Sequence, residues 1–453
     1  MKKKKYLIIL ITLASVFVFT YFLMNNIIGT KKLVLIKQLI PVDVKVIIKK
    51  YFFPHKVAKA KKENRELLIK VTENDIQLKE SLQNIIFINK NKTLKKNELN
   101  VLFFLMEKKN QILKGIHNYT PGSGYLEYYE DKLFLLSSVG IIGYSDINLN
   151  ILNFKQIENN IDNFINKDQF LKGIAYSVRD LKIFDGKVYV SLIKEIRNNC
   201  WNTSIIYSEL NYDKLDFKKL FIPNECINAP EIEGFNAGSS GGRIVKLNKD
   251  FIAFSTGEFL ARDVAQIEDS IFGKILKINI LTGKHEIISL GHRNPQGLFF
   301  DETNEYLVSS EHGPKGGDEL NLIYLNSIKK PNYGWPIASY GEHYDGLKNK
   351  INYKKYPLLK PHKKYGFVEP LKYFTPSIAP SEIIRLNNNK YVLSSLKGKQ
   401  LFIFNLNNNN KLINLESFEI GERIRDLAYG NNLIFLFLED TASIGIIKDN
   451  VIN

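Results

Sequence analysis

Cysteine is scarce in this chain of 453 residues, which contains only Cys200 and Cys226. No histidine accompanies either cysteine at the spacing of metal ligands, which disfavours a thiolate metal centre or a catalytic thiol. Two cysteines are compatible with one disulfide in an oxidising compartment, although spacing alone does not establish the bond. The two are therefore a candidate disulfide.

Acidic residues are almost absent from the first 62 residues, where Asp43 stands against fourteen lysines. This segment carries +13 of the net charge of +16, so the remaining 391 residues carry only +3. A cluster of lysines beside a membrane suits anionic lipid headgroups, and we expect no nucleic-acid partner. Residues 35–53 mix apolar residues with lysines, which is typical either of a membrane-surface segment or of a solvated tether.

The N-terminus lacks the features of a cleaved leader. Residues 2–5 are lysines and residues 6–24 carry no charge, a run that as a helix is about 28 Å long and can cross a bilayer. No A-x-A-like cleavage site follows it, and no cysteine stands where a lipoprotein needs one. We expect a single-pass inner-membrane anchor over residues 1–28, with the C-terminal domain in the periplasm. A cleaved signal peptide is the alternative.

One unit recurs after about residue 116: an apolar strand, a turn of Asp, Asn or Gly, and a second apolar strand. Aspartate, asparagine and glycine tolerate the positive φ that tight hairpins require. Six copies occur at intervals of 43 to 85 residues. They are GYLEYYEDKLFLLS from Gly124, DLKIFDGKVYVS from Asp180, RIVKLNKDFIAFS from Arg243, GLFFDETNEYLVS from Gly297, EIIRLNNNKYVLS from Glu382 and RDLAYGNNLIFLF from Arg425.

These hairpins predict an all-β protein, a six-bladed β-propeller over residues 116–453, since radial repetition leaves only short, protected strand edges. A two-sheet sandwich is the second choice. A basic juxtamembrane stalk, which we expect to be helical, fills residues 29–115 between the membrane anchor and the propeller. Long inserts such as residues 325–372 are expected on one face, where propellers build their sites.

Basic residues precede or follow many of the predicted inner strands, which line the central channel of a propeller. They are Arg179, Arg243, Arg293, Lys397, Arg423 and Arg425. Converging guanidinium groups repel one another unless an anion lies among them, and the arginine fork matches carboxylates in pairs. A ligand with several carboxylates is one interpretation. The other is that each arginine pairs with a local acid such as Asp180, Glu422 or Asp426, although GHRNPQG around Arg293 offers no such acid.

Eight ordered motifs lie between residues 238 and 447: GGRIV, FGKILKIN, GHRNPQG, EHGPKGGDELN, NYGWPIASYG, TPSIAPS, SSLKGKQL and GERIRD. In these motifs the chain resembles the quinoprotein sugar dehydrogenases of the glucose/sorbosone dehydrogenase family, particularly the soluble aldose sugar dehydrogenases. Those proteins are six-bladed propellers that use pyrroloquinoline quinone (PQQ) and calcium. The resemblance does not extend to the first two blades or to residues 1–115.

The resemblance implies that PQQ contacts Arg293, Asn294, Lys397, Arg423 and Arg425. This agrees with the residue-based interpretation, because PQQ has three carboxylates and two quinone oxygens that favour cationic donors. Arg293 beside the quinone oxygens would stabilise the negative charge that develops as hydride arrives.

The resemblance also implies a Ca²⁺ site on the backbone carbonyls of Gly313 and Pro314, which are the hard oxygen ligands that Ca²⁺ prefers. Asp318 and Glu319 follow in the same loop. They either order that loop, hold a second ion or cap the turn.

The pattern departs from the family at the catalytic base. The histidine that removes the hydroxyl proton corresponds here to Ser239, and a serine hydroxyl is not a general base at neutral pH without help. His312 and Glu258 are the candidate substitutes, with pKa values that the surroundings can move toward neutral pH. His292 is a further possibility, although a packed histidine between blades is the simpler interpretation.

Two functions therefore lead. The first is a membrane-anchored, periplasm-facing PQQ- and Ca²⁺-dependent oxidoreductase that acts on CH–OH groups of a sugar or related alcohol and reduces an unidentified electron acceptor. The second is a catalytically degenerate propeller that binds a carbohydrate or an envelope partner without oxidising it. A third, a cofactor-free propeller that binds acidic glycans, is disfavoured by the basic residues of the motifs.

Overall fold

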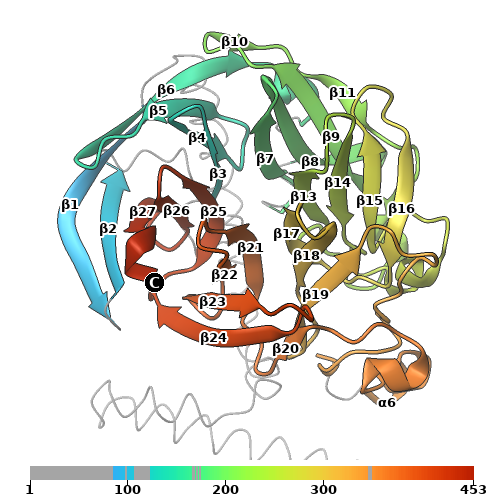
Figure 1. The fold of residues 1–453 in the computed structure, drawn as a ribbon. Helices are drawn as coiled ribbons and strands as arrows, with labels where there is room; N and C mark the ends of the chain where they lie inside the picture. The colour runs from blue at the N-terminus through green and yellow to red at the C-terminus, as the bar shows by residue number, and fades with distance from the viewer. Residues whose placement is uncertain are drawn as a thin grey trace, which may run out of the picture. The chain divides into compact units, whose positions relative to one another are not determined.

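The computed structural model describes residues 85–96, 99–106, 123–165, 169, 172, 175–344 and 349–452. In this part of the chain, antiparallel strands form six blades around a central axis (Figure 1). The predicted six-bladed β-propeller is confirmed, and each of the six sequence copies forms the two innermost strands of one blade.

The first three blades contain the N-terminal half of the propeller. Blade 1 consists of β3 (Gly124–Tyr129), β4 (Lys132–Ser137), β5 (Ile142–Asp146) and β6 (Ile151–Asn159). Blade 2 consists of β7 (Val178–Phe184), β8 (Lys187–Arg197), β9 (Cys200–Glu209) and β11 (Lys218–Phe221), with β12 (Ile227–Asn228) paired to β9. Blade 3 consists of β13 (Gly241–Lys246), β14 (Phe251–Thr256), β15 (Lys274–Asn279) and β16 (His285–Leu290).

The other three blades complete the ring. Blade 4 consists of β17 (Pro295–Asp301), β18 (Tyr306–Glu311), β19 (Asp318–Tyr324) and β20 (Lys372–Phe374). Blade 5 consists of β21 (Pro380–Arg385), β22 (Tyr391–Ser395), β23 (Gln400–Leu406) and β24 (Leu412–Glu419). Blade 6 begins with β25 (Ile424–Gly430), β26 (Leu433–Leu438) and β27 (Ser443–Lys448).

The predicted hairpin turns have the expected backbone. Both central residues have positive φ in the β3–β4 turn (Glu130 and Asp131), the β7–β8 turn (Asp185 and Gly186) and the β25–β26 turn (Asn431 and Asn432). This geometry matches the right-handed twist of the flanking strands and demands residues that tolerate it. In these three hairpins the turn residues therefore favour the observed register.

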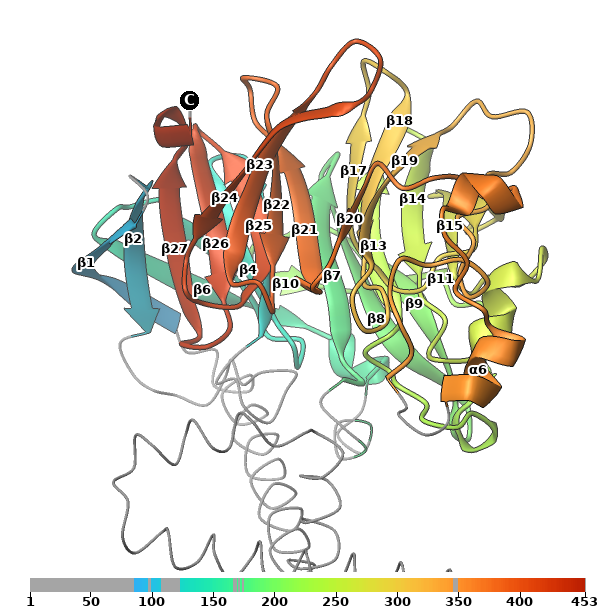
Figure 2. The same ribbon diagram turned by 90° about the horizontal axis from the view of Figure 1, so that it is seen from below.

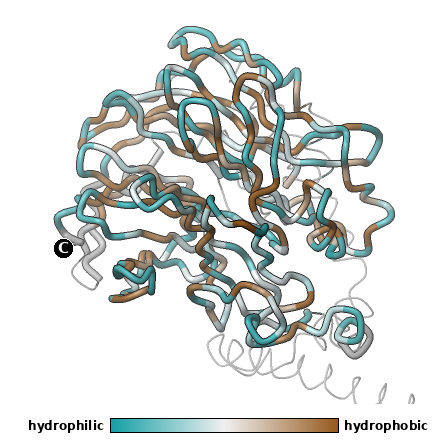
Figure 3. Tube along the Cα trace, turned by 45° about the vertical axis from the view of Figure 1, so that its right-hand side comes forward, coloured by the Kyte–Doolittle hydropathy of each residue, from teal (hydrophilic) through white to brown (hydrophobic). Residues whose placement is uncertain are grey.

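The hydrophobic core lies between neighbouring blades rather than at the axis. Leu126 and Leu135 of blade 1, for example, pack with Phe435 and Phe437 of blade 6. Hydropathy along the chain changes repeatedly from apolar within the strands to polar in the connecting turns (Figure 3). Alternate strand residues thus seal the blade interfaces and leave the loops free to build a site.

Two strands upstream of blade 1 close the ring. Strand β2 (Leu99–Met106) pairs with β27 as the fourth strand of blade 6, and β1 (Ile85–Lys96) joins β2 to β6 of blade 1 (Figures 1 and 2). The prediction that the propeller starts at residue 116 after a helical stalk is therefore wrong for residues 85–96 and 99–106. The lysines and asparagines in the sequence of β1 depart from the apolar pattern of the six inner hairpins, which is why no strand was predicted there.

The predicted membrane anchor over residues 1–28 lies outside the described residues. Among the residues that the structure does describe, no helix is both long and apolar enough to cross a membrane.

A disulfide joins Cys200 and Cys226, whose Cα atoms lie 5.3 Å apart. Cys200 begins β9, and the backbone of Asn228 pairs with it through the short strand β12. The bond therefore fastens the connection between blades 2 and 3 to the outer part of blade 2.

Candidate cofactor and substrate cleft

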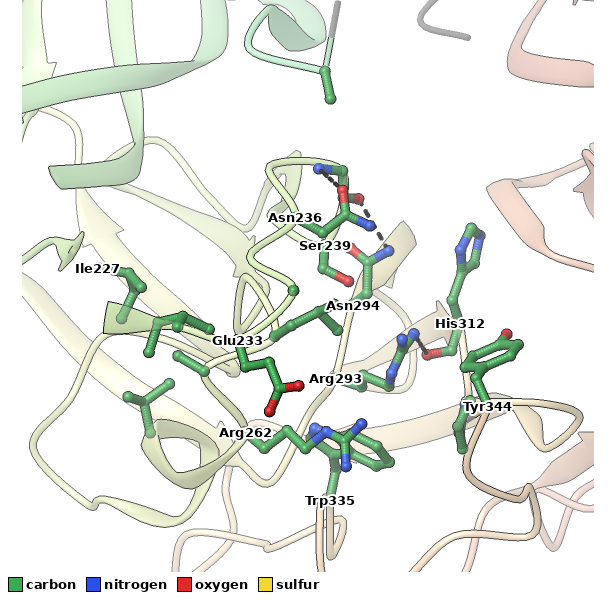
Figure 4. Close-up of a pocket in the computed structure, with 18 of the residues that line it drawn as sticks. Ile227, Glu233, Asn236, Ser239, Arg262, Arg293, Asn294, His312, Trp335 and Tyr344 are labelled. Carbon is green, nitrogen blue, oxygen red and sulfur yellow. Dashed lines mark hydrogen bonds between the residues drawn. The ribbon is translucent and has the colours of Figure 1, made fainter. Parts of the chain in front are cut away.

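A cleft of about 1460 Å³ opens on the face formed by the loops between blades and the loops between second and third strands. Figure 4 shows its lining, with Arg293, His312 and Tyr344 on one side and Glu233 and Arg262 on the other. Among the sequence candidates, Ser239, Arg293, Asn294, His312, Gly313, Pro314, Asp318, Lys397 and Arg425 line it. Glu258, Glu319 and Arg423 do not belong to this lining.

Arg293 is held from several directions at the start of blade 4. Its backbone N–H donates to Glu311 Oε2 at 2.7 Å, and its Nη1 donates to the carbonyl of His312 at 3.0 Å (Figure 4). The guanidinium lies 5.3 Å from the ring centroid of Trp335. Its Nε is buried and has no hydrogen-bond partner. A fixed cation with an unsatisfied donor at a cleft wall suits an anionic ligand.

Glu311 is supported in turn by a buried network. Its Oε1 accepts from Asn321 at 2.8 Å and lies 3.0 Å from His292 Nδ1, while His292 Nε2 lies 2.8 Å from Ser289 Oγ. His292 and Ser289 are fully buried, so this serine–histidine–glutamate arrangement has no access to a substrate. His292 is therefore a packed structural residue that positions Arg293.

Other cations gather at the same end of the cleft. Arg423 and Arg425 share Glu439 through their Nε atoms, at 3.1 and 2.6 Å. Arg425 holds the pKa of the Glu439 carboxyl below its usual range despite burial. Lys397 is exposed in the cleft and forms no ion pair within the described part of the chain. These three cations and Arg293 outnumber the carboxylates of Glu439 and Asp318, so this cofactor end of the cleft is positive.

Arg179 also lines the cleft but without an acid. Its guanidinium donates to the carbonyls of Ala175 and, at 2.8 Å, of Ala237, and its Nε is buried without a partner. Among the described residues, Arg179 therefore binds backbone carbonyls instead of the local acid that the second interpretation predicts.

Arg243 pairs with acidic residues, as the second interpretation of the basic residues predicts. Its Nη1 lies 2.9, 2.7 and 2.6 Å from carboxylate oxygens of Asp180, Glu382 and Asp426, all of them buried at the propeller axis. These three carboxylates are close enough together to hold a metal ion, but the guanidinium already lies among them. Arg243 therefore ties blades 2, 3, 5 and 6 together rather than binding a cofactor.

Gly313 and Pro314 lie in the β18–β19 loop, which is shaped by Asp318. One oxygen of Asp318 accepts from the Gly313 N–H at 2.9 Å, and the other accepts from the N–H groups of Ile378 and Ala379, each at 2.7 Å. A carboxylate used in this way orders the loop, which is one of the roles predicted for Asp318.

Glu319 faces away from the cleft into a buried pocket. There it lies 3.5 Å from His362 Nε2 and 3.3 Å from Asn321 Nδ2. Burial raises the pKa of Glu319 well above its usual value, and the charge of nearby Glu311 adds to the effect. Glu319 does not line the cleft, and its predicted role as a turn cap or as a ligand of a second ion stays a prediction.

The three base candidates differ in their access to the cleft. Ser239 lines the cleft beside Asn294, whose amide holds the loop through Gly241 N–H at 3.0 Å and the Gly238 carbonyl at 3.3 Å (Figure 4). His312 also lines it, but burial lowers the pKa of its imidazole to about 3 and its Nε2 lies 2.8 Å from the Pro380 carbonyl.

Glu258 has no exposed surface, and neither carboxylate oxygen has a hydrogen-bond partner. Burial raises the pKa of Glu258 to about 7, against the lowering effect of Arg293 and Arg262. It is buried and does not belong to the cleft lining.

The sequence analysis did not identify the functional residues on the side of the cleft opposite His312. Trp335 belongs to the motif NYGWPIASYG, which had no assigned role, and its ring lies between the Arg293 and Arg262 guanidinium groups at 5.3 and 5.8 Å. Arg262 and Glu233 stand in no recognisable motif. Only the fold brings them to one wall.

The fold and the cleft define a β-propeller with a cationic site for an anionic ligand. The family model for Glucose / Sorbosone dehydrogenase matches residues 182–448, which is more than half of the chain. The chain belongs to this family.

Known relatives agree with this assignment. The Aldose sugar dehydrogenase YliI of Escherichia coli strain K12 is 30% identical over 229 residues, which cover 46% of this chain and 59% of that protein. The chain spans about half the length of the first curated relatives that it matches. The apo-form crystal structure of the soluble aldose sugar dehydrogenase from E. coli has a TM-score of 0.59 at 20% identity, covering 77% of this chain and 99% of that one. The PQQ-bound aldose sugar dehydrogenase of Streptomyces coelicolor has a TM-score of 0.54 at 18% identity, covering 81% and 98%. Because their sequence identities to this chain are low, these two structures show only that the chain shares their fold.

Proposed function

We propose that this protein is a PQQ- and Ca²⁺-dependent oxidoreductase of a sugar or related alcohol. The observation that carries the proposal is the partly buried Arg293 guanidinium, which forms no ion pair with the described residues and lines a cleft wall that also presents Lys397 and Arg425. A small ligand with several carboxylates and quinone oxygens satisfies these donors. The family membership and the PQQ named for the Streptomyces relative support the same ligand.

The residues present fit such a cofactor. Arg293, Lys397 and Arg425 would bind its oxygens, with Arg423 behind them sharing Glu439. Asn294 would act mainly by holding the Ser239 loop, because its amide is used within the protein. The carbonyls of Gly313 and Pro314 would hold Ca²⁺, in a loop that Asp318 keeps in shape.

When bound, PQQ supplies a quinone that accepts a hydride, and Ca²⁺ polarises that quinone as a Lewis acid. The chain contributes a fixed positive charge: the Arg293 guanidinium stabilises negative charge on a ligand oxygen without reorganising, because Glu311, His312 and Trp335 already hold it. The substrate hydroxyl would lie beside Ser239, which leaves the removal of its proton as the weakest step.

A catalytically degenerate propeller that binds carbohydrate or an envelope partner is the second candidate. The observation that favours it concerns the candidate bases named from the sequence: the Ser239 hydroxyl holds its proton too tightly, and burial makes the His312 imidazole weakly basic. Glu258 has a suitable pKa but no exposed surface.

We further propose that the chain is anchored in the inner membrane by residues 6–24, with lipid as a partner of the anchor and the propeller in the periplasm. The uncharged run, the lysines before it and a disulfide suited to an oxidising compartment support this placement. The electron acceptor is to be found among periplasmic or membrane carriers.

The experiment combines the purified chain with PQQ and Ca²⁺ and follows the absorbance of the quinone as aldoses are added. We expect PQQ to bind and to be reduced slowly by at least one sugar. Binding without reduction by any sugar would leave the second candidate, and no PQQ binding would reject the oxidoreductase.

A further inference from the structure

A short sequence recurs in the innermost strands of blades 2 and 6. It is VRDL from Val178 at the start of β7 and IRDL from Ile424 at the start of β25. In both strands the arginine is the extra residue of a β-bulge, because the pairing register shifts across Arg179 in blade 2 and across Arg425 in blade 6. A bulge re-aims a side chain, and both of these arginines line the cleft.

The aspartates that follow the two arginines also correspond. Asp180 accepts from the backbone N–H of Ile244 in blade 3, and Asp426 accepts from that of Leu126 in blade 1, each at 2.7 Å. Each aspartate thus binds the innermost strand of the next blade around the ring. Figure 1 shows β7 and β25 as innermost strands on either side of β3. The two arginines therefore reach the cleft from equivalent positions of two blades.

The two positions differ in their acidic partner. Arg425 pairs with Glu439 at 2.6 Å. Glu439 comes directly after the strand partner of the residue that begins β25, and the residue at the same place in blade 2 is Ile193. Ile193 is fully buried in an apolar cluster. Arg179 therefore lacks the carboxylate that neutralises its counterpart.

Arg179 is a buried cation without a counter-ion. Three arginines of the described chain are almost fully buried, and the other two, Arg243 and Arg425, pair with carboxylates. Arg179 is 4% exposed, and its Nε is buried without a hydrogen-bond partner. Burial lowers the pKa of Arg179 and the charge of Arg425 adds to this effect, although Tyr125 opposes it. A buried charge without its partner is costly, and an anion in the cleft would offset that cost.

The side chain of Arg179 has a defined place near Ser239. Its guanidinium donates to the carbonyl of Ala237 at 2.8 Å, two residues before Ser239. Gly242 of the motif GGRIV leaves room for this side chain, since a Cβ atom there would collide with Arg179. The guanidinium is also close enough to Arg425 for their charges to interact. Arg179 therefore extends the cationic lining of the cleft from the cofactor end toward Ser239.

We propose that Arg179 is a carboxylate-binding residue of the cleft, and that its missing counter-ion is a carboxylate of the ligand bound there. An arginine fork matches a carboxylate better than any neutral group. Two ligands can supply this group: PQQ, which has three carboxylates, or a substrate that is a sugar acid. PQQ as a source rests on the proposed function, whereas the carboxylate site itself does not.

Two titrations of the full-length chain distinguish these sources. PQQ binding with Ca²⁺ is followed by absorbance, and the binding of glucuronate and of its neutral counterpart glucose is followed by calorimetry with and without PQQ. If the cofactor supplies the carboxylate, Arg179→Met should weaken PQQ binding about tenfold or more. If the substrate supplies it, the wild type should bind glucuronate more tightly than glucose, and Arg179→Met should reduce that preference about tenfold with PQQ affinity unchanged.

Two further variants separate binding from loop support. Arg179→Lys keeps the positive charge, so it should retain more carboxylate affinity than Arg179→Met does. Lys194→Met is the matched control: Lys194 also belongs to blade 2 and donates to a backbone carbonyl, that of Phe164 at 2.9 Å, but it does not line the cleft. This control should bind every probe as the wild type does.

Unchanged PQQ affinity together with an unchanged preference for glucuronate in Arg179→Met would overturn the proposal. Equal losses in Arg179→Met and Arg179→Lys would do the same, because a side chain that only supports the Ala237 carbonyl predicts that result. The two proposals fail separately. A wild type that binds glucuronate through Arg179 but does not bind PQQ keeps the carboxylate site and rejects the oxidoreductase, whereas PQQ reduction with no effect of Arg179→Met on either titration does the reverse.

Discussion

Glu258 is a buried carboxyl without a hydrogen-bond partner, and its titration should be visible in the stability of the protein. We consider Glu258→Gln, which keeps the shape of the side chain and removes its charge. The pKa of Glu258 is raised to about 7 in the folded protein by burial, from 4.5 as the ordinary value. Between these two values the folded state binds a proton that the unfolded state has lost, so the free energy of unfolding falls as pH rises.

The size of this effect follows from the two pKa values. Between pH 5 and pH 8 the ionisation of Glu258 lowers the free energy of unfolding by about 2.5 kcal/mol. Glu258→Gln cannot ionise and should lack that loss. Its unpaired amide has a cost of about 1–3 kcal/mol, but this cost is the same at both pH values and cancels in the comparison.

The assay is urea unfolding of the wild type and of Glu258→Gln at pH 5 and at pH 8. The free energy of unfolding of the variant minus that of the wild type should be about 2.5 kcal/mol larger at pH 8 than at pH 5. Glu439→Gln is the control: Arg425 lowers the pKa of Glu439 despite burial, so the stability that this carboxylate contributes is present at both pH 5 and pH 8, and the variant should be destabilised by a similar amount at both. An equal Glu258→Gln effect at both pH values would refute the reasoning.

Three further predictions concern other parts of the chain. Ser239→His should raise sugar-dependent quinone reduction, toward the roughly 10²- to 10⁴-fold that a positioned base provides, without changing PQQ affinity; no reduction by either protein would favour the binding propeller. Reduction of the Cys200–Cys226 bond, whose partners are 26 residues apart, should lower the free energy of unfolding by about 3.5 kcal/mol, and unchanged urea midpoints would contradict this. The mature protein should keep its N-terminus, and a soluble periplasmic form starting near residue 30 would disprove the anchor.

Local sequence signals predicted much of the fold. The inner hairpins depend on apolar strands and on turn residues such as Asp185 and Asn431, which act within a few residues of one another. Strands β1 and β2 pair with each other locally, but the pairing that adds them to the propeller is long-range: β2 joins β27, more than three hundred residues later. Periodicity within these strands could not reveal that partner.

The sequence predicted the parts of the site that depend on the chemistry of single side chains. It did not predict the parts that depend on which side chains are buried. The motif around Arg293 indicated a cation without a local acid, and the structure places it at the cleft wall. The sequence could not tell that Glu258 is buried, or that Arg243 meets Glu382 from a blade 139 positions away. Both facts depend on how blades pack against one another.

The central claim is that the cationic end of the cleft binds PQQ, and a pair of lysine variants tests it most directly. Lys397→Ala removes a free cation from the cleft, whereas Lys246→Ala removes an exposed lysine that pairs with Asp185 away from it. In absorbance titrations with PQQ and Ca²⁺, we predict about tenfold or greater weakening for Lys397→Ala and none for Lys246→Ala, since a charge-assisted contact is worth roughly 1.5–3 kcal/mol. Identical titration curves for wild type, Lys397→Ala and Lys246→Ala would contradict the account.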